Sequence, residues 1–231
     1  VPLSPAGRAE LQAVFPNVII SDGYGASETG AQATNLGDGR FKSFDGETLV
    51  LDPATLEPVE PGSGQEGRVA RRGHIPLGYY NDPVKTAETF VTYGGERWVL
   101  TGDVATVHDD GTIQLLGRGS LCINTGGEKV FPEEVEEAIE THPAVRDSTV
   151  VGVPDSNTGE AVAAVVELAA GAEVSEAALI AHVKARLAGY KAPRHVVLVA
   201  DVGRSPNGKA DYAGAKRRVL DHLAAQVGTT V

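Results

Sequence analysis

The densest group of residues with chemical potential is Asp22-Gly23-Tyr24-Gly25-Ala26-Ser27-Glu28-Thr29-Gly30. Its glycines allow the backbone to approach a ligand closely. Tyr24 offers a flat face to a base, and Asp22 can accept a hydrogen bond from an exocyclic amine. Ser27 can bind a phosphate, and Glu28 offers Mg²⁺ the hard oxygen ligand that it prefers. A glycine-rich turn with surface polar residues is the alternative, and this motif alone does not separate the two.

A second group, Thr101-Gly102-Asp103, closes a predicted strand. A carboxylate at a strand end can accept hydrogen bonds from both hydroxyls of a ribose, as an acidic residue does in dinucleotide-binding folds. Taken alone, the tripeptide is more commonly an ordinary turn with an aspartate.

A third group joins Gly117-Arg118-Gly119-Ser120 to Asn124-Thr125-Gly126-Gly127-Glu128-Lys129. The guanidinium of Arg118 can bind ribose or phosphate with a fixed fork of donors. The two adjacent glycines suit a loop that passes close to a ligand. An interdomain linker has the same composition, so both interpretations stay open.

The fourth group is Ser205-Pro206-Asn207-Gly208-Lys209. A fixed ammonium can stabilise a developing anion in a transition state, although a lysine on a turn is usually solvated surface. The six histidines are scattered and show no metal-binding spacing with cysteine. A Gly-x-Ser-x-Gly hydrolase motif is absent from the sequence.

The elements around these groups must position them. Ser4–Phe15 is expected to be a helix, with Pro16 just beyond its end. Val18–Ser21 is a short apolar, β-branched run, which predicts a buried strand. This strand leads into the segment that begins at Asp22, which we expect to be a glycine-rich turn. In α/β sheets, ligands bind at such strand ends.

From Phe41 to Gly117, short apolar runs alternate with Gly, Pro and Asp turns, which predicts a small antiparallel sheet or distorted barrel. The expected strands are Thr48–Leu51, Gly67–Ala70, Trp98–Leu100, Val104–Val107 and Thr112–Leu116. His108–Gly111 is typical of a hairpin turn. A helix is expected over Pro83–Phe90, with Asp82 as its cap.

Beyond a second expected loop at Gly117–Gly127, the pattern becomes α+β, so we place a domain boundary near Arg118–Ser120. Pro132 opens a helix with acidic residues in its first turn. Ser175 caps another helix, and the last is expected over Ala210–Ala225. The expected strands are Val145–Val153, Glu160–Leu168 and His195–Val199.

Composition excludes several classes of protein. The 231 residues include 20 basic and 31 acidic ones, and the net charge of −11 argues against general nucleic-acid binding. Hydrophobic residues make up 42%, as in a soluble globular protein, and no run approaches the length of a membrane helix. The single cysteine excludes an internal disulfide framework and favours a cytoplasmic location.

The order and spacing of the motifs say more than each motif alone. From about Val18 to Tyr212 the chain resembles the adenylate-forming (AMP-binding) superfamily of acyl-CoA synthetases, luciferases and peptide-synthetase adenylation domains, and most of all actinobacterial fatty-acyl or steroid side-chain CoA ligases. The motifs are Gly23–Thr29, Leu77–Pro83 with Thr86–Phe90, Trp98 with Thr101–Asp103, Gly117–Arg118 with Gly126–Glu136, Gly152–Asp155 with Gly159–Glu160, Tyr190–Arg194, and Pro206–Lys209.

The resemblance implies an AMP-forming acid–thiol ligase. A carboxylic acid attacks the α-phosphate of ATP to give acyl-AMP and pyrophosphate, and the thiol of CoA then displaces AMP. The implied fold class is α/β and α+β. Residues 1–117 would be the end of a nucleotide-binding α/β subdomain plus a small antiparallel β-barrel-like subdomain, and residues 118–231 a small, mobile α+β C-terminal domain.

The resemblance also implies a role for each matching residue. Contacts to ATP or AMP are implied for Asp22, Gly23, Tyr24, Gly25, Ser27, Asp103 and Arg118. Glu28 would hold Mg²⁺, and Lys209 would bridge the substrate carboxylate and the α-phosphate, so these two are the implied catalytic residues. Ser120 lies at the hinge. The resemblance places Gly126, Gly127 and Lys129 in the loop along the tunnel that holds the pantetheine arm of CoA.

Some positions depart from the family pattern. Ser120 stands where aspartate or lysine is usual, Asp22 replaces glutamine or asparagine, and Ser27 replaces threonine. The family's phosphate-gripping loop lies upstream of the tyrosine-glycine motif and is absent from these residues. The chain also lacks a methionine at position 1. We therefore expect a fragment that needs the N-terminal portion of the same enzyme and does not complete adenylation alone.

Two alternatives remain. An adenylation domain would deliver its acyl group to a carrier protein, but no carrier motif with its serine follows Lys209. A non-catalytic nucleotide-binding module derived from a ligase would not need Asp103, Arg118 and Lys209 intact. Neither the acyl chain length, the pathway nor the oligomeric state follows from the sequence.

Overall fold

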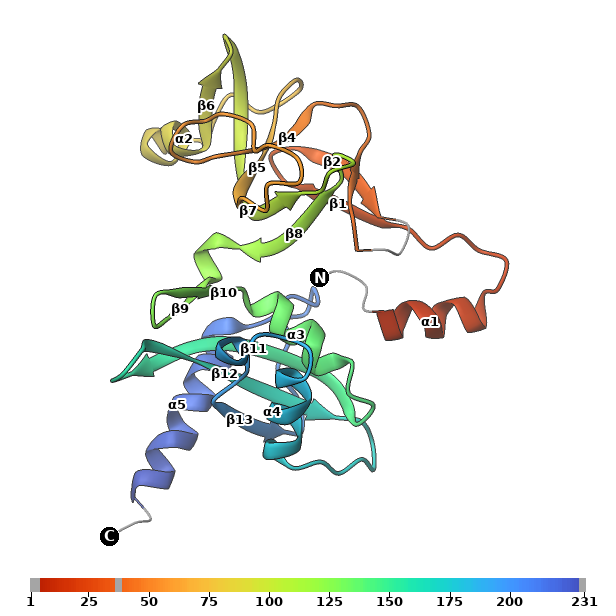
Figure 1. Ribbon diagram of the computed structural model, residues 1–231, viewed down its shortest axis with the longest axis vertical. Coiled ribbons are helices and arrows are strands. Elements are labelled where there is room, and N and C mark those ends of the chain that lie inside the picture. Colours follow the sequence, from red (N-terminus) through yellow and green to blue (C-terminus); the bar gives the residue numbers. More distant parts are fainter. Residues whose placement is uncertain (1–4, 36–38, 229–231) are drawn as a thin grey trace. The chain divides into compact units, whose positions relative to one another are not determined.

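The computed structural model describes residues 5–35 and 39–228 and divides into two compact units (Figure 1). One unit ends at Ser120, and the other begins at Leu121. The first helix, α1, covers Pro5–Val14, close to its expected range, and the expected start at Ser4 lies outside the described residues. Whether the two units are the functional domains expected at 1–117 and 118–231 stays a prediction.

Two predictions near Asp22 are wrong. Val18–Ser21 is not a strand, because its backbone pairs with no strand among the described residues, and Ile19 is 85% exposed. The segment after it is not one long turn either. Strands β1 (Asp22–Ala26) and β2 (Gly30–Asn35) form an antiparallel hairpin, to which β3 (Lys42–Ser43) adds a third strand. Only the residues between Ala26 and Gly30 form the turn.

The close approach of two backbones explains why glycine stands in β1. The register of the β1–β2 pair shifts between Tyr24 and Gly25, which makes the strand irregular there. A Cβ atom at Gly25 would lie 2.2 Å from the carbonyl oxygen of Gly30. The glycines that look like a loop signal in the sequence are therefore required by strand pairing.

The expected antiparallel sheet is confirmed as a curled, five-stranded sheet. Its order is β4-β5-β7-β6, with β8 paired to β7. The strands are β4 (Thr48–Leu51), β5 (Gly67–Arg71), β6 (Phe90–Tyr93), β7 (Glu96–Val107) and β8 (Ile113–Arg118). The predicted hairpin at His108–Gly111 joins β7 to β8, and Gly111 has a φ of 78°. β7 is long enough to pair with three other strands.

Helix α2 (Pro83–Thr89) begins as the sequence predicts. Asp82 caps it, because its Oδ1 accepts the backbone N–H of Lys85 at 2.9 Å. Proline occupies the first turn, where a missing N–H costs nothing.

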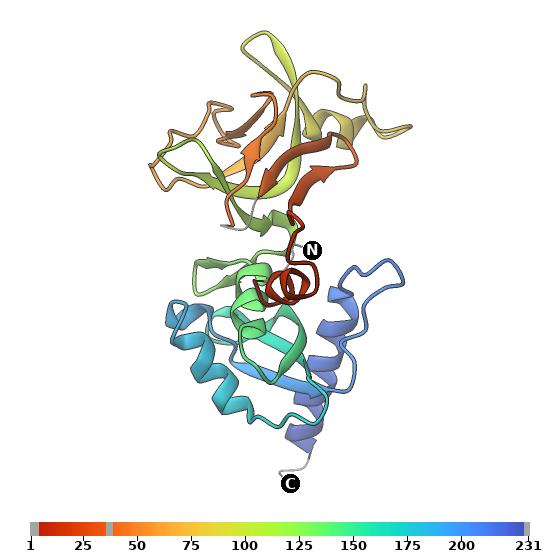
Figure 2. The same cartoon turned by 90° about the vertical axis from the view of Figure 1, so that its right-hand side faces the viewer.

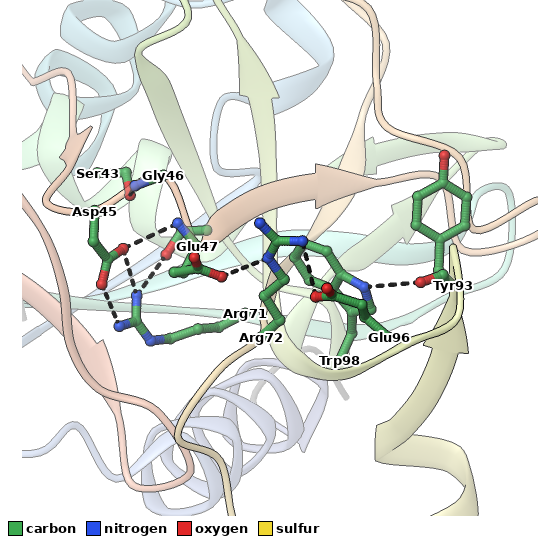
Figure 3. Close-up of polar contacts among 10 residues, drawn as sticks. Ser43, Asp45, Gly46, Glu47, Arg71, Arg72, Tyr93, Glu96 and Trp98 are labelled. Carbon is green, nitrogen blue, oxygen red and sulfur yellow. Dashed lines mark hydrogen bonds and ion pairs between the residues drawn. The ribbon is translucent and has the colours of Figure 1, made fainter.

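Ion pairs connect strand ends of the five-stranded sheet (Figure 3). Arg72 in the segment after β5 binds Glu47 and Glu96, with 2.8 Å to the latter, and so links the start of β4 to β7. Arg71 pairs with Asp45 at 2.7 Å. Because each arginine already has carboxylate partners, we assign this cluster to the sheet's structure.

The second unit is an α+β layer structure. Its sheet has the order β10-β9-β12-β11, and β13 pairs with β12 in parallel. The strands are β9 (Ile123–Thr125), β10 (Glu128–Val130), β11 (Val145–Asp155), β12 (Gly159–Leu168) and β13 (His195–Val199). The expected loop at Gly117–Gly127 is wrong in part, because it contains a short 3-10 turn at Gly119–Leu121 and all of β9.

Helices cover both faces of this sheet (Figure 2). Helices α3 (Pro132–Glu140) and α4 (Glu176–Lys184) pack with Val150 of β11 in one core. Helix α5 (Tyr212–Gly228) packs with Val151 and Val153 in another. Successive residues of β11 thus serve opposite faces, as the period of a strand requires. The predicted cap Ser175 accepts the N–H of Ala178.

Candidate active site

The first unit brings Tyr24 and Asp103 together although 79 positions separate them. The hydroxyl of Tyr24 donates a hydrogen bond of 2.7 Å to Oδ2 of Asp103. The same hydroxyl lies 3.3 Å from that of Thr101. Burial raises the pKa of Tyr24, and the negative charge of Asp103 raises it further, so the phenol keeps its proton and remains a donor.

Strand pairing places Arg118 beside the same carboxylate. Asp103 of β7 is paired with Arg118 at the end of β8. The guanidinium Nε lies 3.5 Å from Oδ1 of Asp103, and the Arg118 side chain is 65% exposed. Asp103 is much less exposed, at 17%. The three sequence-predicted residues Tyr24, Asp103 and Arg118 therefore form one group, with the arginine on its open side.

The ring of Tyr24 is partly covered by its neighbours and is not fully open to a stacking base. It packs edge-on against Phe41, with ring centroids 5.9 Å apart, at the side of a buried core cluster. Its stacking on a base therefore stays a prediction.

Glu28 lies in the turn between β1 and β2, and its partner comes from the segment before α2. The hydroxyl of Tyr79 donates a hydrogen bond of 2.5 Å to Oε1 of Glu28. This bond lowers the pKa of Glu28, and the charges of Lys85 and Arg118 lower it further. Glu28 is therefore held as a carboxylate, the form that binds a metal ion.

Tyr79 itself is firmly held. Its backbone N–H donates to Oγ1 of Thr86 at 2.9 Å, its ring meets Phe90 edge-on, and the ammonium of Lys85 lies 4.0 Å from its ring centroid. The sequence marks Tyr79 only as a member of the Leu77–Pro83 motif. Its role was missed because the contact crosses 51 positions.

Asp22 is placed differently from the group around Asp103. Its Oδ2 forms an ion pair of 2.7 Å with Nη2 of Arg8 in α1, and its side chain is 15% exposed. Arg8 also donates to the carbonyl oxygen of Ile20. The sequence gives no signal for this pair. Of the neighbouring predicted positions, Gly23, Gly25 and Ser27 are exposed.

The second unit carries the remaining predicted residues. Gly126 and Gly127 form the exposed turn of the β9–β10 hairpin, with φ values of 63° and 90°. Lys129 follows in β10 and is exposed. Ser120, the last residue of the first unit, is exposed in the 3-10 turn.

Lys209 is exposed at the end of a tight turn between β13 and α5. The N–H of Ser205 donates to the carbonyl oxygen of Lys209 at 2.9 Å, and Gly208 has a φ of 78°. A left-handed residue at this point favours glycine, which the motif supplies.

Over residues 5–35 and 39–228, no cluster of three or more His, Cys, Asp or Glu side chains could hold a metal ion. None of the helices in these ranges is long and apolar enough to cross a membrane.

Comparison with known proteins finds similar proteins in the superfamily that the motifs resemble. Residues 134–209 match the AMP-binding enzyme C-terminal domain. The chain is 50% identical over 221 residues to a medium/long-chain-fatty-acid–CoA/3-oxocholest-4-en-26-oate–CoA ligase of Mycolicibacterium smegmatis. It is 49% identical over 220 residues to a 3-oxocholest-4-en-26-oate–CoA ligase of Rhodococcus rhodochrous. These alignments cover 93% and 92% of the chain but 40% of each relative.

The fold agrees with solved structures. ATP-bound MatB from Rhodopseudomonas palustris is 30% identical and superposes with a TM-score of 0.79, covering 96% of this chain and 44% of that one. By the alignments to the two ligases above, the chain spans about two-fifths of the length of the curated relatives that it matches, 40% in both cases.

Proposed function

We propose that the chain is the C-terminal part of an ATP-dependent acyl-CoA ligase, since residues 134–209 match the AMP-binding enzyme C-terminal domain. The observation that carries the proposal is its identity of 48–50% to ligases for fatty acids and 3-oxocholest-4-en-26-oate over nearly all its length. The proposed substrates are a fatty or steroid side-chain acid, ATP and CoA. The single cysteine supports a reducing cytoplasm as the location.

Asp103 and Arg118 bind the ribose of the nucleotide in this proposal. The Oδ2 of Asp103 already accepts the Tyr24 hydroxyl, which orients the carboxylate. Its remaining lone pairs can accept ribose hydroxyls, while the exposed Arg118 supplies donors to the ribose or a phosphate. The remaining proposed nucleotide contacts come from the β1–β2 hairpin, which also carries Tyr24: Asp22, Gly23, Gly25 and Ser27.

Glu28 fits a magnesium ion that arrives with the triphosphate. Mg²⁺ in such sites needs one or two protein carboxylates, because phosphate oxygens and waters complete its shell. A single carboxylate, kept ionised by the Tyr79 hydroxyl, meets that need. When bound, the ion offsets the charge of the phosphoryl oxygens.

Lys209 and the glycine hairpin serve the two half-reactions. In the first, a carboxylate oxygen of the acid bonds to the α-phosphorus, the bond to the bridging oxygen breaks, and pyrophosphate leaves. The ammonium of Lys209 stabilises the two anions as they meet. In the second, the CoA sulfur bonds to the acyl carbon, the bond from that carbon to the phosphate oxygen breaks, and AMP leaves while the thiol proton passes to solvent. Gly126, Gly127 and Lys129 line the path of the pantetheine arm, and Ser120 is the hinge between the two arrangements.

The test is a fusion that replaces the matching segment of the Mycolicibacterium smegmatis ligase with this chain. We expect the fusion to release pyrophosphate and form acyl-CoA with a long-chain fatty acid and with 3-oxocholest-4-en-26-oate. The 231-residue chain alone and the upstream segment alone are the controls, and neither should turn over.

A soluble fusion that binds ATP but forms neither acyl-AMP nor acyl-CoA would refute the proposal. Formation of acyl-AMP without transfer to CoA would favour an adenylation domain that delivers its acyl group to a carrier protein.

A further inference from the structure

The turn that presents Lys209, residues 205–209, is held together by its own hydrogen bonds, and one side chain attaches it to the sheet. Within it, the N–H of Gly208 donates to the carbonyl oxygen of Ser205 at 2.8 Å, and the Ser205 hydroxyl lies 2.8 Å from the carbonyl oxygen of Lys209. These bonds fix the shape of the turn. They do not fix its position, because both partners of each bond belong to the turn.

Arg204 supplies the attachment. Its Nε donates to Oδ2 of Asp147 at 2.6 Å, and its Nη2 donates to Oδ1 at 2.5 Å. Its third arm, Nη1, lies 3.3 Å from the carbonyl oxygen of Gly208, in the peptide that joins Gly208 to Lys209. The guanidinium thus connects strand β11 to the peptide next to Lys209.

Other anchors hold the chain only before and after the turn. Before it, the N–H of Val202 donates to Glu167, and Arg218 donates to the carbonyl oxygen of Asp201. After it, Asp211 accepts the N–H of Gly214. In the described chain, Arg204 makes the only hydrogen bond or ion pair that ties residues 205–210 to the sheet.

The ion pair is built for rigidity. The side chains of Arg204 and Asp147 are 24% and 21% exposed, so water competes weakly for either partner. A bidentate arginine–carboxylate pair fixes an angle as well as a distance. Lysine carries the same charge but has no planar fork, and it cannot hold both carboxylate oxygens and a peptide oxygen in one geometry.

We infer that Arg204 and Asp147 are a positioning pair for the adenylation step, which hold the Lys209 turn at a fixed place on β11. The inference rests on the proposed function of Lys209. Neither residue touches substrate, and their effect passes through the Gly208–Lys209 peptide.

The first experiment compares Arg204→Lys with Arg146→Lys in the fusion enzyme. Arg146 is a matched control. It is also an arginine with a carboxylate partner at β11, but it binds Glu167 and its own side chain is 72% exposed. Pyrophosphate release measures adenylation, and thioester formation from supplied acyl-AMP measures the second step. We expect Arg204→Lys to lower kcat for adenylation by about ten- to a hundredfold, as a small misplacement of a catalytic group does. The second step and the control should stay within about twofold.

A second experiment needs no activity. The ¹⁵N order parameters of the Gly208 and Lys209 amides in the 231-residue chain should fall in Arg204→Lys and in Asp147→Asn, because the turn loses its attachment to β11, while those of β12 stay unchanged. Unchanged order parameters, unchanged adenylation, or equal loss of both half-reactions overturns the inference. An inactive unmutated fusion counts against the proposed function instead, and the relaxation experiment then decides the positioning role alone.

Discussion

The hydroxyl of Tyr79 is the largest influence on the charge of Glu28. Removing it in Tyr79→Phe takes away a hydrogen bond to the ionised form, so the pKa of Glu28 should rise. A ¹³C NMR titration of the Glu28 carboxyl carbon measures this directly. Tyr80→Phe is the control, because the neighbouring tyrosine is 93% exposed. A pKa of Glu28 that is the same in both variants would contradict the assigned contact.

At this scale the sequence predicts residue types better than partners. It identifies Tyr24, Glu28 and Asp103 as candidates, because glycine-rich and strand-end positions suit ligand binding. It does not predict that Tyr24 would bind Asp103, or that Tyr79 would bind Glu28. Those contacts depend on which strands, turns and loops lie side by side, and local periodicity carries no information about that.

At the scale of elements, the β1–β2 hairpin contains one glycine that the fold requires, Gly25, and one that it does not, Gly23. A Cβ at Gly25 would collide with the Gly30 carbonyl, whereas a Cβ at Gly23 meets nothing within 4 Å. Gly25→Ala should therefore destabilise the first unit by about 1–3 kcal/mol, the usual cost of overpacking. Gly23→Ala should leave stability unchanged.

Thermal unfolding of the 231-residue chain compares the two variants. If Gly23→Ala lowers ATP affinity of the fusion without lowering stability, the backbone at Gly23 lies close to the nucleotide, as we propose. Equal stability of Gly25→Ala and the unmutated chain would mean that the hairpin does not pair in the observed register.

The packing of α3 on β11 makes the second unit sensitive to pH. Burial raises the pKa of Glu136 from its ordinary 4.5 to about 8, although its carboxylate accepts the N–H of Val150. Burial raises the pKa of Glu140 as well. The folded unit thus keeps protons that the unfolded chain releases, so this contribution is full below about pH 4.5 and is lost as pH rises to about 8.

Urea unfolding across that window should show stability falling with rising pH, and Glu136→Gln should flatten the slope while keeping the acceptor for Val150. Glu137→Gln, an exposed change on the same helix, should leave the slope as it is. A slope unaffected by Glu136→Gln would show that Glu136 ionises normally.

Elements with strong end signals were predicted correctly. The Asp82 and Ser175 caps, the Asp-Gly hairpin before Thr112 and the proline of α3 act locally, so their signals are readable in a short window. The errors lie at Val18–Ser21 and Gly117–Gly127. There, apolar residues are exposed or glycines belong to strands, and the outcome depends on distant pairing partners.

At the scale of the whole molecule, the proposed contacts fall into two groups. Tyr24, Glu28, Asp103 and Arg118 belong to the unit that ends at Ser120, while Gly127 and Lys209 belong to the unit that begins at Leu121. Chain order and motif spacing indicate this division, but which residues act in which half-reaction follows only from the family resemblance and needs a direct test.

Lys209→Ala and Gly127→Leu should separate the two half-reactions in the fusion enzyme. Loss of the ammonium removes about 3–4 kcal/mol of transition-state stabilisation, so Lys209→Ala should abolish most acyl-AMP formation yet largely spare thioester formation from supplied acyl-AMP. Gly127→Leu should do the reverse, because its side chain would fill the proposed path of pantetheine.

Backbone strain alone can also explain a loss in Gly127→Leu, since Gly127 has a φ of 90°. Gly171→Leu is the matched control, because Gly171 is exposed, has a φ of 75° and has no atom within 4 Å of an added Cβ. If both leucine variants unfold alike but only Gly127→Leu loses CoA transfer, the loss is specific to the hairpin. Parallel losses of transfer in both variants, or loss of both half-reactions in Lys209→Ala, would contradict the division of labour between the two loops.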